Sequence, residues 1–177
     1  MKKEIWTIGH STHTLEEFVT LLQSFRIETL IDVRSLPGSR KFPHFDKEAL
    51  ETEMPKNGIQ YLHFKDLGGR RKTSKASRNT AWRLASFRGY ADYMETDAFL
   101  HAVKRLEGIG QEARAAFFCA EAVWWSCHRS LIADFLKHRD WTVFHIMGVG
   151  KAQEHPYTRP ARIVDHQLVY WEDKTEL

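Results

Sequence analysis

Apolar residues recur along the chain in two alternating patterns, short continuous runs and stretches with helical spacing. The runs have the length of buried strands and lie at 5–8, 29–34, 59–64, 115–119 and 142–147. Apolar residues spaced three and four apart predict helices over 14–25, 46–56, 90–106 and 127–138. Strands that alternate with helices predict an α/β fold: one three-layer domain with a mostly parallel sheet of about five strands.

Local signals place several boundaries. Thr14 is followed three residues later by Glu17, the arrangement of a capping box at a helix start. Asn57-Gly58 is expected to end the second helix. Asp165-His166, inside a short alternating stretch, predicts the turn of a small hairpin. The chain is therefore expected to end in a short β extension.

Length and composition limit the class of protein. We expect one domain over 1–177, with a core in 1–150 and an extension in 151–177. No apolar run approaches the roughly 20 residues that cross a bilayer, and the N-terminus becomes polar too early for a secretory signal. Two cysteines are too few for a disulfide framework, so we expect a cytoplasmic protein that has no membrane partner.

Positive charge is concentrated in one segment. The whole chain carries a net charge of +3, but 65–88 holds eight basic residues and one acid, which is +7 and leaves −4 for the remainder. This segment lacks a clear period and is read as a long surface loop. Its focused charge predicts an anionic partner, a small molecule or a nucleic acid.

Candidate chemistry follows three of the predicted strands. Because parallel strands open their carboxyl ends onto one edge of a sheet, the residues after them are expected to converge. These residues are His10 and Ser11 after the first strand, Asp32 and Arg34 at the second, and Glu121, Cys127, His128 and Arg129 after the fourth.

A cysteine in this group has the surroundings of a nucleophile. Ser126 is expected to cap the last helix, which would place Cys127 in the first turn beside Arg129, where a thiol pKa falls. His128 or His10 could act as its base, but adjacent helical residues point about 100° apart, which weakens a Cys127–His128 pair and makes His10 the better candidate. The alternative is a buried cysteine that only fills space.

Two carboxylates in the group suit acid–base work. Glu121 and Asp32 at neighbouring strand ends could act on a phosphoester or glycosidic bond. The alternative is that they pair with Arg34 and Arg129 as a structural ion network. We expect no metal and no other cofactor, since the spacing of Cys119 and Cys127 matches no common zinc motif. Without a CxxC arrangement, these cysteines are not expected to form a redox pair.

Aromatic residues accompany both charged regions. Trp82, Phe87 and Tyr90 follow the arginines of the basic loop, a combination that can bind phosphates and stack on bases, unless the aromatics belong to the next helix. Trp124 and Trp125 adjoin the Cys127 turn. Adjacent residues face different ways, so one tryptophan is expected to pack on the core and Trp125 to edge the site.

The chain also resembles the DUF488 family of bacteria and archaea in motifs that span nearly its whole length. They are TIGHS (7–11), IDVRSLPGSR (31–40), DLGGRR (66–71), SFRGYADYM (86–94), CAEAV (119–123), CHRSLIADFL (127–136) and HPYTRPARIV (155–164). Trp124 stands where the family usually has proline. The resemblance implies that the GHS, DVR, GGRR, CAE and CHR residues form the functional surface, and it supplies no reaction.

These observations lead to a first hypothesis and two alternatives. The first is a hydrolase that acts on a phosphate-bearing substrate, such as a nucleotide or nucleic acid, at a phosphoester or N-glycosidic bond. Glu121, Asp32, His10 and Cys127 are the candidate catalytic residues; Ser11, Arg34, Arg70, Arg71, Trp125, His128 and Arg129 are the candidate binding residues. The alternatives are a non-catalytic module that binds an anion or nucleic acid and, more weakly, a thiol redox protein.

Overall fold

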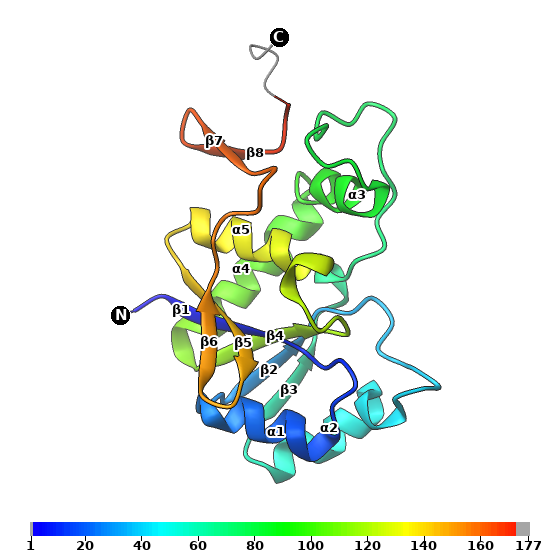
Figure 1. Cartoon of the computed structure of the whole chain (residues 1–177), viewed down its shortest axis with the longest axis vertical. Coiled ribbons are helices and arrows are strands. Elements are labelled where there is room, and N and C mark those ends of the chain that lie inside the picture. Colours follow the sequence, from blue (N-terminus) through cyan, green and yellow to red (C-terminus); the bar gives the residue numbers. More distant parts are fainter. Residues whose placement is uncertain (1, 173–177) are drawn as a thin grey trace.

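The fold is built on one six-stranded sheet with the strand order β3-β2-β4-β1-β5-β6 (Figure 1). The structure is a computed structural model that describes residues 2–172. Its main-sheet strands are β1 (Glu4–Gly9), β2 (Thr29–Asp32), β3 (Gln60–His63), β4 (Ala115–Cys119), β5 (Thr142–Gly148) and β6 (Lys151–Glu154). All neighbouring strands are parallel except β5 and β6. The expected α/β fold with a mostly parallel sheet is confirmed.

Helices cover both faces of this sheet and give the fold three layers (Figure 1). They are α1 (Leu15–Ser24), α2 (Lys47–Lys56), α3 (Ala85–Tyr93), α4 (Asp97–Glu112) and α5 (Arg129–His138). The apolar sides of α1 and α2 pack in one core cluster, and those of α3, α4 and α5 pack in the other. Each face of the sheet thus has its own core.

Strand β4 lies in the middle of the sheet and joins the two cores. Its limits coincide with the apolar run 115–119, and all five residues are buried. Side chains of a strand alternate between the two faces of a sheet. Phe117 accordingly packs with α4 and α5, and Phe118 packs with α1. Burial on both faces explains why this strand reads as a continuous apolar run.

The sequence did not predict two features of the topology. Strands β1 and β2 are parallel but not adjacent, because β4 lies between them. The sheet has a sixth strand, β6, which turns back at Gly150 (φ +66°) to pair antiparallel with β5. The residues of β6 are exposed and, apart from Ala152, polar, so no apolar pattern predicted a strand there.

The helix boundaries also needed two corrections. The predicted helix over 90–106 is two helices, and Thr96 caps the second by accepting a hydrogen bond from Phe99 N. Ser126 is not a helix cap: it ends a 3₁₀ turn (Trp124–Ser126), Cys127 is extended, and α5 begins at Arg129. The capping box of Thr14 and Glu17 is confirmed.

The C-terminal segment forms the expected hairpin, β7 (Arg162–Val164) and β8 (Gln167–Val169), at the top of Figure 1. Buried Asp134 of α5 anchors the residues on either side of it. Its carboxylate accepts hydrogen bonds from His155 Nε2 (2.8 Å), Thr158 N (2.9 Å) and the Tyr170 hydroxyl (2.8 Å). Among residues 2–172, no helix combines the length and apolar character that a membrane crossing requires.

Candidate functional site

The loops after β1, β2 and β4 meet at the carboxyl edge of the sheet and enclose a cavity of about 860 Å³. Backbone hydrogen bonds hold them side by side beyond the strands: His10 N donates to Cys119 O (2.9 Å), and Ser11 N donates to Ala120 O (2.9 Å). The cavity is lined by His10, Ser11, Arg34, Arg70, Glu121, Cys127 and His128 from the predicted set. The predicted convergence of three separate loops is therefore confirmed.

Gly9 allows two of these loops to approach each other. A Cβ atom at this position would lie 1.7 Å from the carbonyl oxygen of Glu121 and 3.1 Å from Arg129 Nη1. Any side chain here would force the loop after β4 away from β1. The glycine of the GHS motif is thus required by close packing of backbone on backbone.

Arg34 is a rigidly held guanidinium at the cavity. Its Nε and Nη2 bind the two carboxylate oxygens of Asp32 (2.9 and 2.8 Å), and Nη2 also donates to Phe45 O (2.6 Å). The Tyr61 hydroxyl donates to the same carboxylate. Asp32 is fully buried and does not line the cavity. The contacts of Asp32 favour the structural ion pair with Arg34 over an acid–base role.

His10 lies beside Arg34 and contributes an uncharged ring. The ring stacks on Phe45 with centroids 4.4 Å apart, Nδ1 donates to Ser11 O (2.9 Å), and Nε2 faces Arg34 Nη1 at 3.5 Å. Burial lowers the pKa of His10 to about 4. Both ring nitrogens already have partners, which favours a role in shaping the cavity wall over the expected role as base for Cys127.

Cys127 and His128 form a contact that a helical conformation would have prevented. Cys127 Sγ lies 3.4 Å from His128 Nδ1, and His128 Nε2 donates to Val33 O (2.7 Å). The bond to Val33 leaves Nδ1 as the free acceptor of the ring, facing the thiol. Because Cys127 is extended, the helical geometry that weakened this pair does not apply, and both residues line the cavity. Burial lowers the pKa of His128 to about 4, so the ring is neutral at pH 7.

The second cysteine, Cys119, is buried and free, as Cys127 is. The Cys119 thiol donates to Glu121 O at 3.9 Å, and both cysteines line the cavity. Burial raises the pKa of Cys127 well above its usual value, and the neighbouring sulfur raises it further. Burial also acts to raise the pKa of Cys119, but the neighbouring Cys127 side chain and the charge of Arg129 bring it below its usual value.

Arg129 contacts Cys127 through its backbone N–H, which donates to Sγ at 3.5 Å, and its side chain does not line the cavity. Its side chain is buried, with a relative exposure of 2%. Nε and Nη1 have no hydrogen-bond partner among the described residues, and no ion pair found there includes this guanidinium. The expected ion pair with Glu121 or Asp32 does not form, and direct contact with a ligand in the cavity is not favoured.

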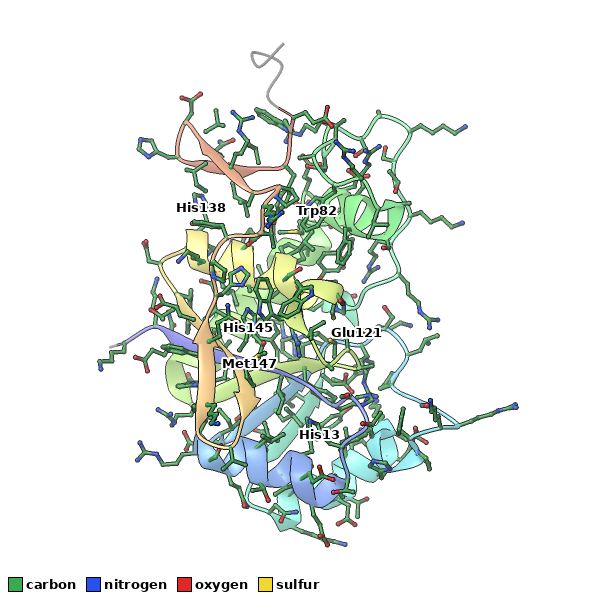
Figure 2. The ribbon with its side chains drawn as sticks, viewed as in Figure 1. His13, Trp82, Glu121, His138, His145 and Met147 are labelled. Atoms are coloured by element: carbon green, nitrogen blue, oxygen red, sulfur yellow. The ribbon has the colours of Figure 1, made fainter. Side chains whose placement is uncertain are left out.

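Of the predicted site residues Glu121 and Trp125, only Glu121 lines the cavity. Glu121 is exposed on the loop after β4 and lines the cavity (Figure 2). Trp124 is buried and stacks on His145 with centroids 4.7 Å apart, as expected for one tryptophan of the pair. Trp125 is 55% exposed but is not among the residues that line the cavity, so it does not edge the site as expected.

The basic segment supplies one cation to the cavity, Arg70. Arg71, expected to bind the anion, instead donates to Gly68 O (3.1 Å) and stacks on the Tyr93 ring at 3.7 Å. Arg78 pairs with Glu95, and Arg88 Nε donates to Trp82 O (2.8 Å). Most arginines of this segment thus hold the loop together.

The aromatic residues of the segment belong largely to the core. Trp82 stacks on Phe87 with centroids 4.9 Å apart, and both pack against the cluster of α4 and α5. Tyr90 is buried, lines the cavity, and donates through its hydroxyl to Leu67 O (2.7 Å). These positions favour packing over stacking with bases of a nucleic acid.

Sequence reasoning missed several residues of the cavity. Lys41 adds a third cation, so the charged lining comprises three cations and one acid, Glu121, among the described residues. Leu36 and Leu84, 65% and 64% exposed, form part of an apolar wall. These residues lie in loops without periodicity, so no pattern placed them. The cavity combines positive charge with apolar surface.

Fold and cavity together define the class: an α/β protein whose parallel sheet carries a polar cavity at its carboxyl edge, the usual place for ligands in such sheets. No group of three or more candidate metal ligands occurs in residues 2–172. The family model "Domain of unknown function DUF488" matches residues 14–136, more than half of the chain, which therefore belongs to that family. Neither a curated protein nor a solved structure matches it.

Proposed function

We propose that the protein is a hydrolase that cleaves phosphate esters with Cys127 as the nucleophile. The observation that carries the proposal is the contact of Cys127 Sγ with His128 Nδ1 (3.4 Å), while His128 Nε2 is fixed by Val33 O (2.7 Å). A nucleophile, an adjacent base and a group that orients the base are the parts that covalent catalysis requires. Cys127 and His128 both line the cavity, to which Arg34 and Arg70 also contribute.

Three cations give the cavity its preference for an anion. Arg34 and Arg70 line it together with Lys41, against the single carboxylate of Glu121. The guanidinium of Arg34 is fixed by Asp32, and its Nη1 lies 3.5 Å from His10 Nε2. A preorganised guanidinium stabilises the charge on phosphoryl oxygens at little reorganisation cost.

The apolar wall points to the rest of the substrate. Leu36, Phe42, Leu84 and Phe87 line the same cavity as the cations. Apolar and aromatic side chains suit the base of a nucleotide, and the cavity volume of about 860 Å³ is within the range for small ligands. We therefore favour a nucleotide-sized phosphate ester over a long nucleic acid, for which the basic segment offers few free arginines.

The reaction consists of two steps, transfer of the phosphoryl group to Cys127 and its release to water. Cys127 Sγ attacks phosphorus while its proton moves to His128 Nδ1; the S–P bond forms, the P–O bond to the leaving group breaks, and His128 returns the proton to the leaving oxygen. Because burial raises the pKa of Cys127, proton transfer accompanies the attack. The Glu121 carboxylate then takes a proton from a water molecule as the water oxygen attacks phosphorus. The new O–P bond forms, the S–P bond breaks, and phosphate leaves. The proton on Glu121 returns to the Cys127 thiolate.

Release of inorganic phosphate from a panel of nucleotides and simple phosphate esters tests this reaction. Cys127→Ser is expected to lower kcat by about a thousandfold or more. Glu121→Gln should abolish turnover and leave ligand affinity nearly unchanged. Cys119→Ser is the matched control, since it removes a neighbouring thiol and keeps the contact between Cys127 and His128. Activity that survives in Cys127→Ser would refute the role of Cys127.

One observation favours a non-catalytic module that binds the same anion. Burial keeps the Cys127 thiol protonated, which lowers its reactivity. In that case nucleotides and phosphate would bind, with affinity reduced in Arg70→Gln, and no member of the panel would be turned over. Calorimetry beside the phosphate assay separates the two functions.

A further inference from the structure

Two glycines of the GGRR motif have no role in the proposed hydrolysis, which uses only Arg70 of that motif. Gly68 and Gly69 follow the 3₁₀ turn Lys65–Leu67, and Gly69 lines the cavity. The φ angle of Gly69 lies outside the left-handed region, which glycine adopts at no steric cost. Any need for glycine at this position is thus a need for space.

Gly69 packs against the face of the His128 ring. A Cβ atom at Gly69 would lie 3.1 Å from Nδ1, 3.4 Å from Cγ and 3.5 Å from Cε1 of His128. These nearly equal distances place it over the ring face, since an atom in the ring plane beyond Nδ1 would be much farther from both carbons. A contact of 3.1 Å is tighter than ordinary van der Waals contact, so either the ring or the turn must give way.

The ring cannot give way without losing its alignment. His128 Nε2 donates to Val33 O (2.7 Å), and Nδ1 faces Cys127 Sγ at 3.4 Å. The Tyr90 ring also packs on it, with centroids 5.0 Å apart. Pressure on the ring face at Nδ1 would therefore swing that atom out of line with Sγ. Catalysis depends steeply on such alignment.

The turn that carries Gly69 is held as firmly as the ring. Ser35 Oγ donates to Gly69 O (2.6 Å). Gly68 lies so close to the loop after β2 that a Cβ atom there would be 2.7 Å from Ser35 Cα. The turn has therefore little room to move, and a methyl group added at Gly69 would displace the His128 ring.

We propose that Gly69 is a positioning residue for the hydrolysis, because it leaves the space in which His128 Nδ1 stands against Cys127 Sγ. The inference rests on the proposed function, in which Cys127 is the nucleophile. Gly69 directly precedes Arg70, so one turn supports the base and carries a cation of the cavity. Gly69 acts on proton transfer, so the rate of the chemical step depends on it and substrate binding does not.

Kinetics of Gly69→Ala with para-nitrophenyl phosphate test the proposal. We expect kcat to fall at least about tenfold and KM to change less than about twofold. Gly38→Ala is the matched control, because its added Cβ atom would meet only Asp46 Oδ1, at 4.0 Å, and both constants should be kept. An unchanged kcat in Gly69→Ala, or a loss carried by KM alone, would overturn the proposal.

Alkylation of Cys127 by iodoacetamide separates this inference from the proposed function. The reaction removes the thiol proton but needs no phosphate ester, and tandem mass spectrometry reads Cys127 apart from Cys119. We expect Gly69→Ala to slow alkylation of Cys127 about tenfold and Gly38→Ala to leave it unchanged. Slower alkylation without hydrolysis of any ester would refute the hydrolase and support the role of Gly69. An unchanged alkylation rate would overturn that role even if esters are hydrolysed.

The same assay in a His128→Gln background distinguishes positioning from general damage to the structure. If Gly69 acts through the His128 ring, Gly69→Ala should slow alkylation less than about twofold further once the ring is absent. A second tenfold loss would show that the two residues act independently and would overturn the proposal.

Nuclear magnetic resonance of the unaltered protein keeps the proposal testable if Gly69→Ala folds poorly. We expect a nuclear Overhauser contact between an α proton of Gly69 and the Cε1 proton of His128, because the glycine lies over that edge of the ring. Absence of this contact would overturn the proposal.

Discussion

Asp32 and Arg34, two residues apart at the end of β2, face each other side on, with Nε 2.9 Å from Oδ1 and Nη2 2.8 Å from Oδ2. The carboxylate is fully buried, and the guanidinium reaches the cavity wall. Paired N–H···O bonds fix the plane of a guanidinium. The pair thus turns an otherwise flexible side chain into a fixed feature of the site.

Loss of this pair is expected to be costly. Asp32→Asn leaves the Arg34 charge buried without its partner and should lower the free energy of unfolding by about 3 kcal/mol. Urea unfolding measures the change. Tyr61→Phe is the matched control, since it removes one donor to the same carboxylate and should cost about 1 kcal/mol. Equal losses in the two variants would contradict the importance of the ion pair.

Neighbouring arginines of the basic segment separate ligand binding from structure. Arg70 lines the cavity and is exposed, so Arg70→Gln should weaken phosphate binding about tenfold and leave the melting temperature nearly unchanged. Arg71 bonds Gly68 O and stacks on Tyr93, so Arg71→Gln should lower the melting temperature and leave affinity nearly unchanged. Calorimetry with inorganic phosphate and thermal unfolding provide both readouts. Weaker phosphate binding in Arg71→Gln together with a lower melting temperature in Arg70→Gln would refute these roles of the two arginines.

Gly9 is expected to tolerate no side chain. Gly9→Ala puts a methyl group where the Glu121 carbonyl oxygen lies, so the loop after β4 must shift; we expect loss of phosphate binding and a lower melting temperature. Gly108→Ala in α4 is the control, because nothing lies within 4 Å of the added Cβ atom. It should stabilise the protein by up to about 1 kcal/mol. A harmless Gly9→Ala would contradict the close approach of the loops.

Stability should fall on mild acidification. Burial lowers the pKa values of His10 and His128 to about 4, whereas the unfolded chain has the ordinary value of 6.5. Below pH 6.5 the unfolded chain therefore binds protons that the folded protein refuses. The free energy of unfolding should decline from pH 6.5 towards 4, by up to about 1.4 kcal/mol per pH unit for each histidine.

Unfolding at a series of pH values checks this decline. Between pH 6.5 and about 5 the carboxylates stay mostly ionised, so the histidines dominate the slope. His145, whose pKa burial lowers to about 2, adds to the same slope; His128→Gln removes one of the three groups and should reduce the slope. A flat profile in the unaltered protein would show that the rings are free to protonate in the folded state.

The sequence predicted best where one element carries its own signal. The run 115–119 became β4 without change, because burial on both faces demands continuous apolar residues. The Thr14 and Glu17 capping box and the Asp165-His166 turn depend on neighbours within a few residues, and both formed as expected. The convergence of the loops followed from the parallel sheet alone.

Predictions about individual contacts failed where the backbone left regular structure. An extended Cys127 brought its thiol to His128, a contact that the expected helix disfavoured. The burial of Arg129 without an acid could not be inferred, because the sequence offers Glu121 and Asp32 as nearby partners. Polar strand β6 and the loop residues of the cavity wall carry no periodicity at all.

Strand order has a consequence for biosynthesis. β1 is synthesised before β4 and β5, its partners in the sheet, and β2 also waits for β4 to join it to β1. Such pairings close long loops and are slow to form. In a nascent chain that ends before β4, nothing joins β1 to the pair β2 and β3, and the apolar edges of these strands stay exposed. Chaperones can bind the chain during this time. Premature termination before Cys119 yields no site at all.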